Sequence, residues 1–103
     1  MFAVIYTFEL LPNKEAIFIE AWKNLTQLIY RYEGSLGSRL HKKTDEQFIA
    51  YAQWPDRKTW ENSGSKLPPE ANEYRKIMHE SCVSISTQHE LQMIEDLLAG
   101  SSF

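Results

Sequence analysis

The stretch FIAYAQW, residues 48–54, carries apolar or aromatic side chains at both alternating sets of positions, a pattern typical of a strand buried on both faces. FAVIYTFEL, residues 2–10, has the same character and ends at the turn Leu11-Pro12-Asn13. LGSRLHKK, residues 36–43, and CVSISTQHELQMI, residues 82–94, are instead polar at alternate positions. We therefore expect one antiparallel sheet with the first two stretches at its centre and the last two at its edges.

The segments between the strands have helical spacing. From Asn13, which we expect to act as the N-cap, apolar residues recur every three to four positions as far as Gly34, where the helix should stop. The polar residues 44–47 predict a hairpin turn between the second and third strands. Pro55-Asp56 should open a short helix to about residue 63, and a further helix is expected over residues 70–81.

The order βαββ(αα)β predicts an α+β, ferredoxin-like sandwich with a four-stranded antiparallel sheet. A chain of 103 residues is the size of one domain, so we expect residues 1–103 to form a single domain with one site. The C-terminal tail, residues 97–103, is expected to be mobile.

The two central strands predict a homodimer. Alternate residues of these strands point to opposite faces of the sheet, and both faces receive apolar side chains. One face carries Ala3, Ile5, Ile49 and Tyr51, and the other carries Val4, Tyr6, Phe8, Phe48 and Ala50. Helices cover only one face in this topology, and an exposed Val, Ile or Phe forgoes ~1.5–3 kcal/mol of burial. A second copy stacked on the bare face would form a dimeric α+β barrel and leave each chain's pocket between its own sheet and helices. The alternative is a monomer whose patch binds another protein.

Charge and composition exclude several partners. Eleven basic and fourteen acidic residues give a net charge of -3 with no basic cluster, which argues against nucleic acid as a partner. The N-terminal stretch alternates like a strand, so neither a signal peptide nor a membrane partner is expected, and the predicted location is the cytoplasm. Cys82 is the single cysteine, which excludes an internal disulfide.

Five segments together resemble the antibiotic biosynthesis monooxygenase family of dimeric α+β barrels: MFAVIYTFEL, EAWKNLT, YEGSLGSRLH, FIAYAQWPDRKTWENS and the strand ending HELQMIEDLL. The most specific piece is Trp54-Pro55 followed by Trp60. The resemblance implies an oxygenase that needs neither metal nor flavin, because a deprotonated phenol or anthrone passes an electron to oxygen itself. No cofactor is therefore expected, and the expected partners are a second copy of the chain and a small aromatic molecule.

The family's haem-degrading branch uses an Asn in the first strand, a Trp after the second helix and a His in the following helix. The matching positions here are Tyr6, a site near Ser63, and His79, so two of the three differ and haem chemistry is not expected.

Candidate site residues follow from the chemistry that such an oxygenase requires, namely an apolar slot, a proton acceptor and donors for an oxyanion. The catalytic candidates are Tyr51, Trp54, His79 and Arg39, and the pocket-lining candidates are Tyr6, His41, Trp60 and Tyr74. Each has a structural alternative: Arg39 and His41 as solvated edge residues, His79 as a charge at a helix C-terminus, and the aromatic residues as core. His89 is expected to share a face with Ile85 and Leu91.

No two histidines have the spacing of metal ligands on one element, so no metal site is predicted, and no serine has a neighbouring base. The leading functional hypothesis is a cofactor-independent monooxygenase for a small aromatic or quinol-type compound. A non-catalytic binding module and a stress or signalling dimer with a closed core are the alternatives. An open pocket with a polar group would favour the enzyme, a wholly apolar one the carrier, and a filled one the third hypothesis.

Overall fold

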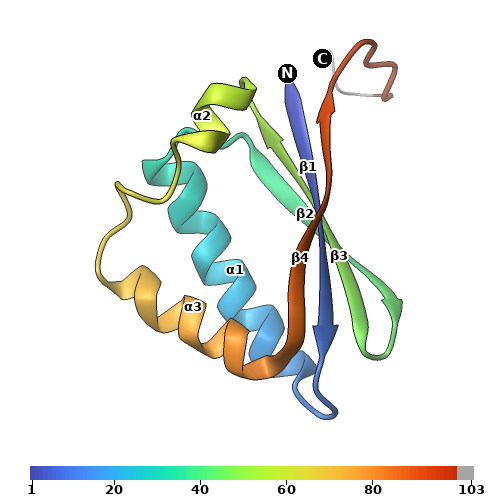
Figure 1. Ribbon diagram of the computed structural model, residues 1–103, viewed down its shortest axis with the longest axis vertical. Helices are drawn as coiled ribbons and strands as arrows, with labels where there is room; N and C mark the ends of the chain where they lie inside the picture. Colours follow the sequence, from blue (N-terminus) through green and yellow to red (C-terminus); the bar gives the residue numbers. More distant parts are fainter. Residues whose placement is uncertain (100–103) are drawn as a thin grey trace.

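The computed structural model describes residues 1–99, and its element order is the predicted one (Figure 1). The strands are β1 (Phe2–Leu10), β2 (Gly37–Thr44), β3 (Gln47–Trp54) and β4 (Cys82–Gln92). The helices are α1 (Glu15–Tyr32), α2 (Arg57–Glu61) and α3 (Glu70–Ser81). The strand order is β2-β3-β1-β4 and all pairs are antiparallel. The expected α+β fold, with β1 and β3 at the centre and β2 and β4 at the edges, is confirmed.

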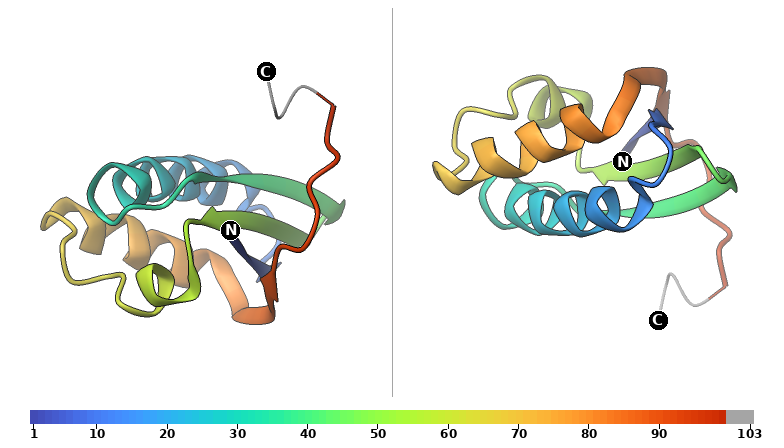
Figure 2. Two further views of the ribbon diagram at one scale, coloured as in Figure 1. Left: turned by 90° about the horizontal axis from the view of Figure 1, so that it is seen from above. Right: turned by 90° about the horizontal axis from the view of Figure 1, so that it is seen from below.

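The three helices lie on one side of the sheet and the other side carries none (Figures 1 and 2). The core fills the space between these two layers. Phe18 of α1 is fully buried between two sheet residues, with its ring 5.0 Å from that of Phe8 and 5.8 Å from that of Phe48. These contacts fix α1 against the centre of the sheet, because large aromatic side chains supply much of the apolar area that a small core buries.

The start of α1 differs from the prediction. Helix α1 begins at Glu15 after Lys14, and no side chain caps it. Asn13 has a φ of 64°, so it turns the chain in the left-handed region that Asn tolerates better than most residues. The prediction of Asn13 as the N-cap is therefore wrong, whereas Gly34, with a φ of 81°, follows the end of the helix as expected.

Strand β4 contains two β-bulges that the sequence pattern did not reveal. Its register against β1 shifts between Ile5 and Tyr6, whose partners are His89 and Thr87, and again between Glu9 and Leu10. Each bulge inserts one extra residue and changes which side chains share a face. His89 and Leu91 consequently lie on the helix-free face while Ile85, opposite Phe8, lies on the helix side. The expectation that His89 shares a face with Ile85 is wrong for this reason.

Beyond β4 the chain continues past the sheet (Figure 1). The backbone N–H of Met93 donates to the carbonyl of Met1, and the N–H of Leu98 donates to Asp96 Oδ1. The expectation of a mobile tail over residues 97–103 falls partly on residues 100–103, which lie outside the described residues.

Candidate functional site

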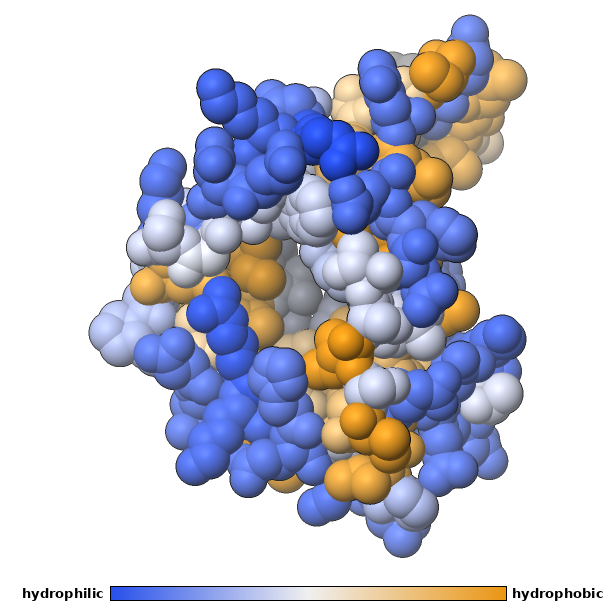
Figure 3. Space-filling model, viewed as in Figure 1, coloured by the Kyte–Doolittle hydropathy of each residue, from blue (hydrophilic) through white to orange (hydrophobic). Residues whose placement is uncertain are grey.

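A cavity of about 230 Å³ lies between the sheet and the helices. The space-filling view shows it as a hollow between the two layers (Figure 3). Its wall is mainly apolar and comes from β1, β3, α1, α3 and β4. An engineered cavity of about 150 Å³ is known to bind benzene, so this one can accept a ring compound larger than benzene.

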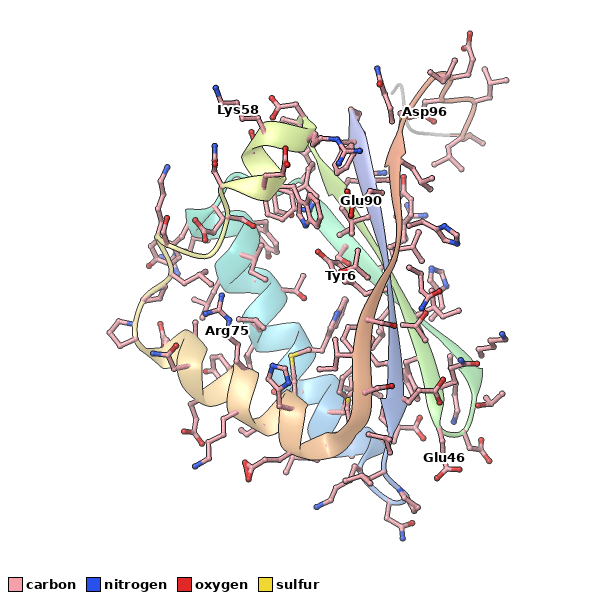
Figure 4. The ribbon with its side chains drawn as sticks, in the orientation of Figure 1. Tyr6, Glu46, Lys58, Arg75, Glu90 and Asp96 are labelled. Carbon is pink, nitrogen blue, oxygen red and sulfur yellow. The ribbon has the colours of Figure 1, made fainter. Side chains whose placement is uncertain are left out.

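The clearest polar feature of the cavity is a tyrosine held by a tryptophan. The indole Nε1 of Trp60 donates a hydrogen bond of 2.8 Å to the hydroxyl oxygen of Tyr6, which lines the cavity from β1 (Figure 4). Burial raises the pKa of Tyr6, although the hydrogen bond from Trp60 works in the opposite direction. The hydroxyl therefore stays protonated at neutral pH and keeps its own proton free to donate to a ligand.

Two residues, Asp56 and Arg57, fix helix α2, which carries Trp60. Asp56 caps the helix, since its Oδ1 accepts from the backbone N–H of Thr59 at 2.7 Å and from the Thr59 hydroxyl at 2.8 Å. These bonds also lower the pKa of Asp56. Arg57 reaches Glu90 of β4 at 2.6 Å and stacks over the ring of Phe2 at 4.6 Å. A five-residue helix is thereby tied to the sheet at the point where Trp60 must meet Tyr6.

Trp54, the last residue of β3, lines the same cavity and is 3% exposed. Its indole Nε1 is buried and has no hydrogen-bond partner among the described residues. An unpaired buried donor is uncommon in folded proteins, because leaving it without a partner costs about 1–3 kcal/mol.

Helix α3 contributes two basic side chains to the cavity. Arg75, which is half-buried, and His79, which is exposed, both line the cavity one helical turn apart. Figure 4 shows Arg75 in the helix layer, across from the strands that carry Tyr6. No carboxylate of residues 1–99 lies within 4.0 Å of the Arg75 guanidinium. The helix thus supplies a guanidinium cation and an imidazole to a mainly apolar wall.

The loop before α3 is held by a buried acid. Glu33, at the end of α1, is 7% exposed and its carboxylate accepts from the backbone N–H of Gly64. Gly64 has a φ of 108°, a conformation that favours glycine, and its Cα faces the Arg75 guanidinium. The carboxylate therefore fixes the loop that adjoins Arg75.

The structure brings some of the expected site residues together. Tyr6, Trp54 and His79 line the cavity, and Trp60 reaches it through its bond to Tyr6. Tyr74 packs against the core cluster beside the cavity and does not line it.

Three other candidates lie on the opposite face of the sheet. Arg39 pairs with Tyr51, and His41 pairs with Ile49, on the rungs that also carry Ile5 and Thr7. Tyr51 is three residues from Trp54 on the same strand, and side chains an odd number of residues apart point to opposite faces. The expectation that Arg39, His41 and Tyr51 lie at the pocket between the sheet and the helices does not match this placement.

Residue-type reasoning missed several lining residues. Arg75, Trp22, Ser35 and Ser38 all line the cavity. Arg75 follows Ala71 by one turn and precedes Met78 by three residues, and both of these are buried, so helical spacing already placed Arg75 beside the buried stripe of α3. The hydroxyls of Ser35 and Ser38 already have hydrogen-bond partners, since they donate to the backbone carbonyls of Gln53 and Tyr51, respectively.

Among residues 1–99, no group of three or more His, Cys, Asp or Glu side chains is arranged to hold a metal ion. Within the same range, no helix is long and apolar enough to cross a membrane.

The layered fold and the cavity between its layers define a small α+β domain suited to binding a small molecule. The sequence model of the antibiotic biosynthesis monooxygenase family matches residues 1–66, and the chain belongs to that family. No curated protein matches the chain.

Solved structures agree on the fold. SnoaB from Streptomyces nogalater, a cofactor-independent oxygenase, is 12% identical with a TM-score of 0.75 over 93% of this chain and 95% of its own. Rv0793 from Mycobacterium tuberculosis is 14% identical with a TM-score of 0.72 over 94% and 98%. A protein of the same family from Nitrosomonas europaea is 14% identical with a TM-score of 0.74 over 92% and 100%. At these identities the likeness establishes the fold alone.

Proposed function

We propose that the protein is a cofactor-independent monooxygenase that oxidises a small, electron-rich aromatic compound of the quinol or anthrone type in the cavity. The observation that supports this most is the Tyr6 hydroxyl, which Trp60 holds at 2.8 Å on the wall of an apolar cavity. An open cavity with polar groups favours an enzyme over a purely apolar carrier or a closed core.

The proposed reaction needs only substrate and oxygen. Loss of a proton gives a carbanion or phenolate, which passes one electron to O₂, and the resulting radical pair combines to form a C–O bond. The peroxide is protonated, its O–O bond breaks with loss of water, and an anthrone CH₂ becomes C=O. The balance is R₂CH₂ + O₂ → R₂C=O + H₂O, in which the carbon loses four electrons and oxygen gains four.

The lining residues can be matched to these steps. His79 is the proposed proton acceptor because its imidazole has a ring nitrogen that can accept a proton and it lines the cavity. Arg75 is the proposed counter-charge for the anion that remains. The protonated Tyr6 hydroxyl can donate to the oxyanion or peroxide, and the apolar wall limits access of water.

Oxygen uptake with a panel of reduced quinols and anthrones tests the proposal. We expect the native protein to consume one O₂ per substrate and the Tyr6→Phe variant to be slower by about a hundredfold, as for the loss of one oxyanion donor. Tyr30→Phe, at an exposed position of α1, is the matched control and should be unchanged. No uptake with any substrate would refute the oxygenase, and binding without uptake would favour a non-catalytic carrier.

We also propose that the protein acts as a homodimer through the helix-free face of the sheet. That face carries Ile5, Ile49 and Tyr51 among polar neighbours, and the segment beyond β4 exposes Ile94 and Leu97. Burying such side chains against a second sheet is favourable.

Sedimentation at micromolar concentration tests the dimer. Ile49→Lys should produce single subunits, whereas Ile17→Lys, at an exposed position of α1, should not. A native protein that sediments as a single subunit would refute the dimer. We further propose a cytoplasmic location, which suits a free thiol at Cys82.

A further inference from the structure

The unpaired indole of Trp54 indicates where a ligand makes a polar contact. Its Nε1–H is buried without a partner, and the residue lines the cavity. Indole nitrogen can only donate, so the missing partner must be an acceptor atom. By contrast, the indole nitrogen of Trp60 is already bonded to Tyr6. Trp54 therefore offers a free donor from a rigid, buried position on β3.

The cavity lining contains basic side chains but no acidic ones. Arg75 and His79 line the cavity, and none of its lining residues is Asp or Glu. The Arg75 guanidinium has no carboxylate of the described chain within 4.0 Å, although it is half-buried and adjoins Gly64 in the loop before α3. A half-buried cation without a counter-charge favours an anionic ligand, and a guanidinium matches the two oxygens of a carboxylate.

The shape and wall between these groups suit a flat ring. Most of the cavity wall is aliphatic or aromatic, and its volume of about 230 Å³ exceeds what benzene needs. Arg75 belongs to α3 and Trp54 to β3, so the two residues lie in the two layers on either side of this space. A ligand that touches both must therefore span the cavity from the helix layer to the sheet.

We infer that the cavity selects a small planar aromatic acid, with its carboxylate at Arg75 and an acceptor oxygen on the ring system at the Trp54 indole N–H. The inference rests on the proposed function, because it names the class of aromatic compound that the same cavity would admit. It adds a contact at Trp54 that the proposed reaction does not require, and it gives Arg75, the counter-charge in that reaction, a second partner in the ligand's carboxylate.

Binding of three related compounds tests the inference. The probe is 6-hydroxy-2-naphthoate; 6-hydroxy-2-naphthamide removes the charge, and 2-naphthoate removes the ring oxygen. We expect calorimetry to show the probe binding at least about tenfold more tightly than the amide and several-fold more tightly than 2-naphthoate. Equal affinity for the probe and the amide would overturn the role of Arg75.

Matched variants locate the two contacts. Arg75→Gln should abolish the preference for the probe over the amide, whereas Lys76→Gln, exposed at the next position of α3, should retain it. Trp54→Phe keeps an aromatic ring without the N–H, and should abolish the preference for the probe over 2-naphthoate. A preference that survives in either site variant would refute the corresponding contact.

The indole proton of Trp54 gives a second readout that does not depend on the Trp54 variant folding. Trp22→Phe and Trp60→Phe assign two of the three indole signals in an NMR spectrum, which leaves the third for Trp54. The probe should shift the Trp54 signal more than 2-naphthoate does, and equal shifts would refute the contact.

The binding measurements require no turnover. Selective binding without oxygen uptake by any quinol would therefore refute the oxygenase and leave this inference standing.

Discussion

Trp60 and Tyr6 are 54 positions apart in the sequence, yet the indole Nε1 of one donates to the hydroxyl oxygen of the other at 2.8 Å. The bond joins the short helix α2 to the central strand β1 at the wall of the cavity. It fixes the direction in which the tyrosine can donate its proton, because the hydroxyl accepts from Trp60 and must donate elsewhere. The position of α2 therefore controls the chemistry available to Tyr6.

Trp60→Phe should raise the pKa of Tyr6 further, because the hydrogen bond from Trp60 is the interaction that lowers it. The variant should also lose about 1 kcal/mol of unfolding free energy. NMR titration of the tyrosine ring carbons, with urea unfolding on the same samples, measures both effects. A Tyr6 pKa that falls in the variant would contradict the prediction.

Tyr6 should make stability depend on pH on the alkaline side. Its pKa is raised above 10.0 in the folded protein, so the folded state retains the proton where the unfolded chain begins to lose it. The stability it contributes is complete below pH 10.0 and is lost as the pH rises toward the folded pKa. Urea unfolding between pH 9 and 11 should show a smaller alkaline loss for Tyr6→Phe than for the native protein. An identical loss of unfolding free energy in both proteins would contradict this role of Tyr6.

Cys82 should react slowly with thiol reagents. It is partly buried, and burial raises the pKa of the thiol from 9.0 to about 11. Because the thiolate is the reactive form, labelling by a disulfide reagent at pH 8 should be about a hundredfold slower in the folded protein than in urea. Equal rates in the two conditions would show that the thiol is not protected.

Two adjacent residues of α1 should differ sharply in their effect on stability. Phe18 is fully buried against Phe8 and Phe48, whereas Ile17 is 50% exposed. Phe18→Ala should cost ~3–5 kcal/mol of unfolding free energy. Ile17→Ala should stay within about 0.5 kcal/mol of the native value, as substitutions away from the core usually do. Similar losses in chemical denaturation would contradict the packing described for α1.

The fold could be predicted from the sequence because its strongest signals are local. The apolar residues of both parities in residues 2–10 and 48–54 placed β1 and β3 at the centre, and this is confirmed. The N-cap at Asn13 was wrong because Asn serves caps and left-handed turns equally well, and only the backbone distinguishes them. The bulges of β4 leave no compositional mark, so the face of His89 could not be read from alternation.

The candidate site was harder to predict because the candidates were chosen by residue type and not by the face of the sheet to which each side chain points. Tyr51 and Arg39 have suitable chemistry, but they form one rung on the helix-free face. Trp54 and Tyr6 lie at the cavity because their parity matches that of the buried Ala52 and Val4. The alternation of side chains along each strand could have separated the residues on the helix-free face from those at the cavity. The hydrogen bond between Trp60 and Tyr6 depends on how α2 packs, so it has no signal in the sequence.

The bulge in β4 makes this edge of the sheet tolerant of changes in chain length. Gln88 is the extra residue between Thr87, which pairs with Tyr6, and His89, which pairs with Ile5. Deleting Gln88 would straighten the strand and leave His89 and the residues after it facing as they do now, because alternation would then be unbroken. Glu90 would keep its place opposite Val4, so its ion pair with Arg57 would survive the deletion. Relatives that lose a residue here without penalty should lose it at the bulge.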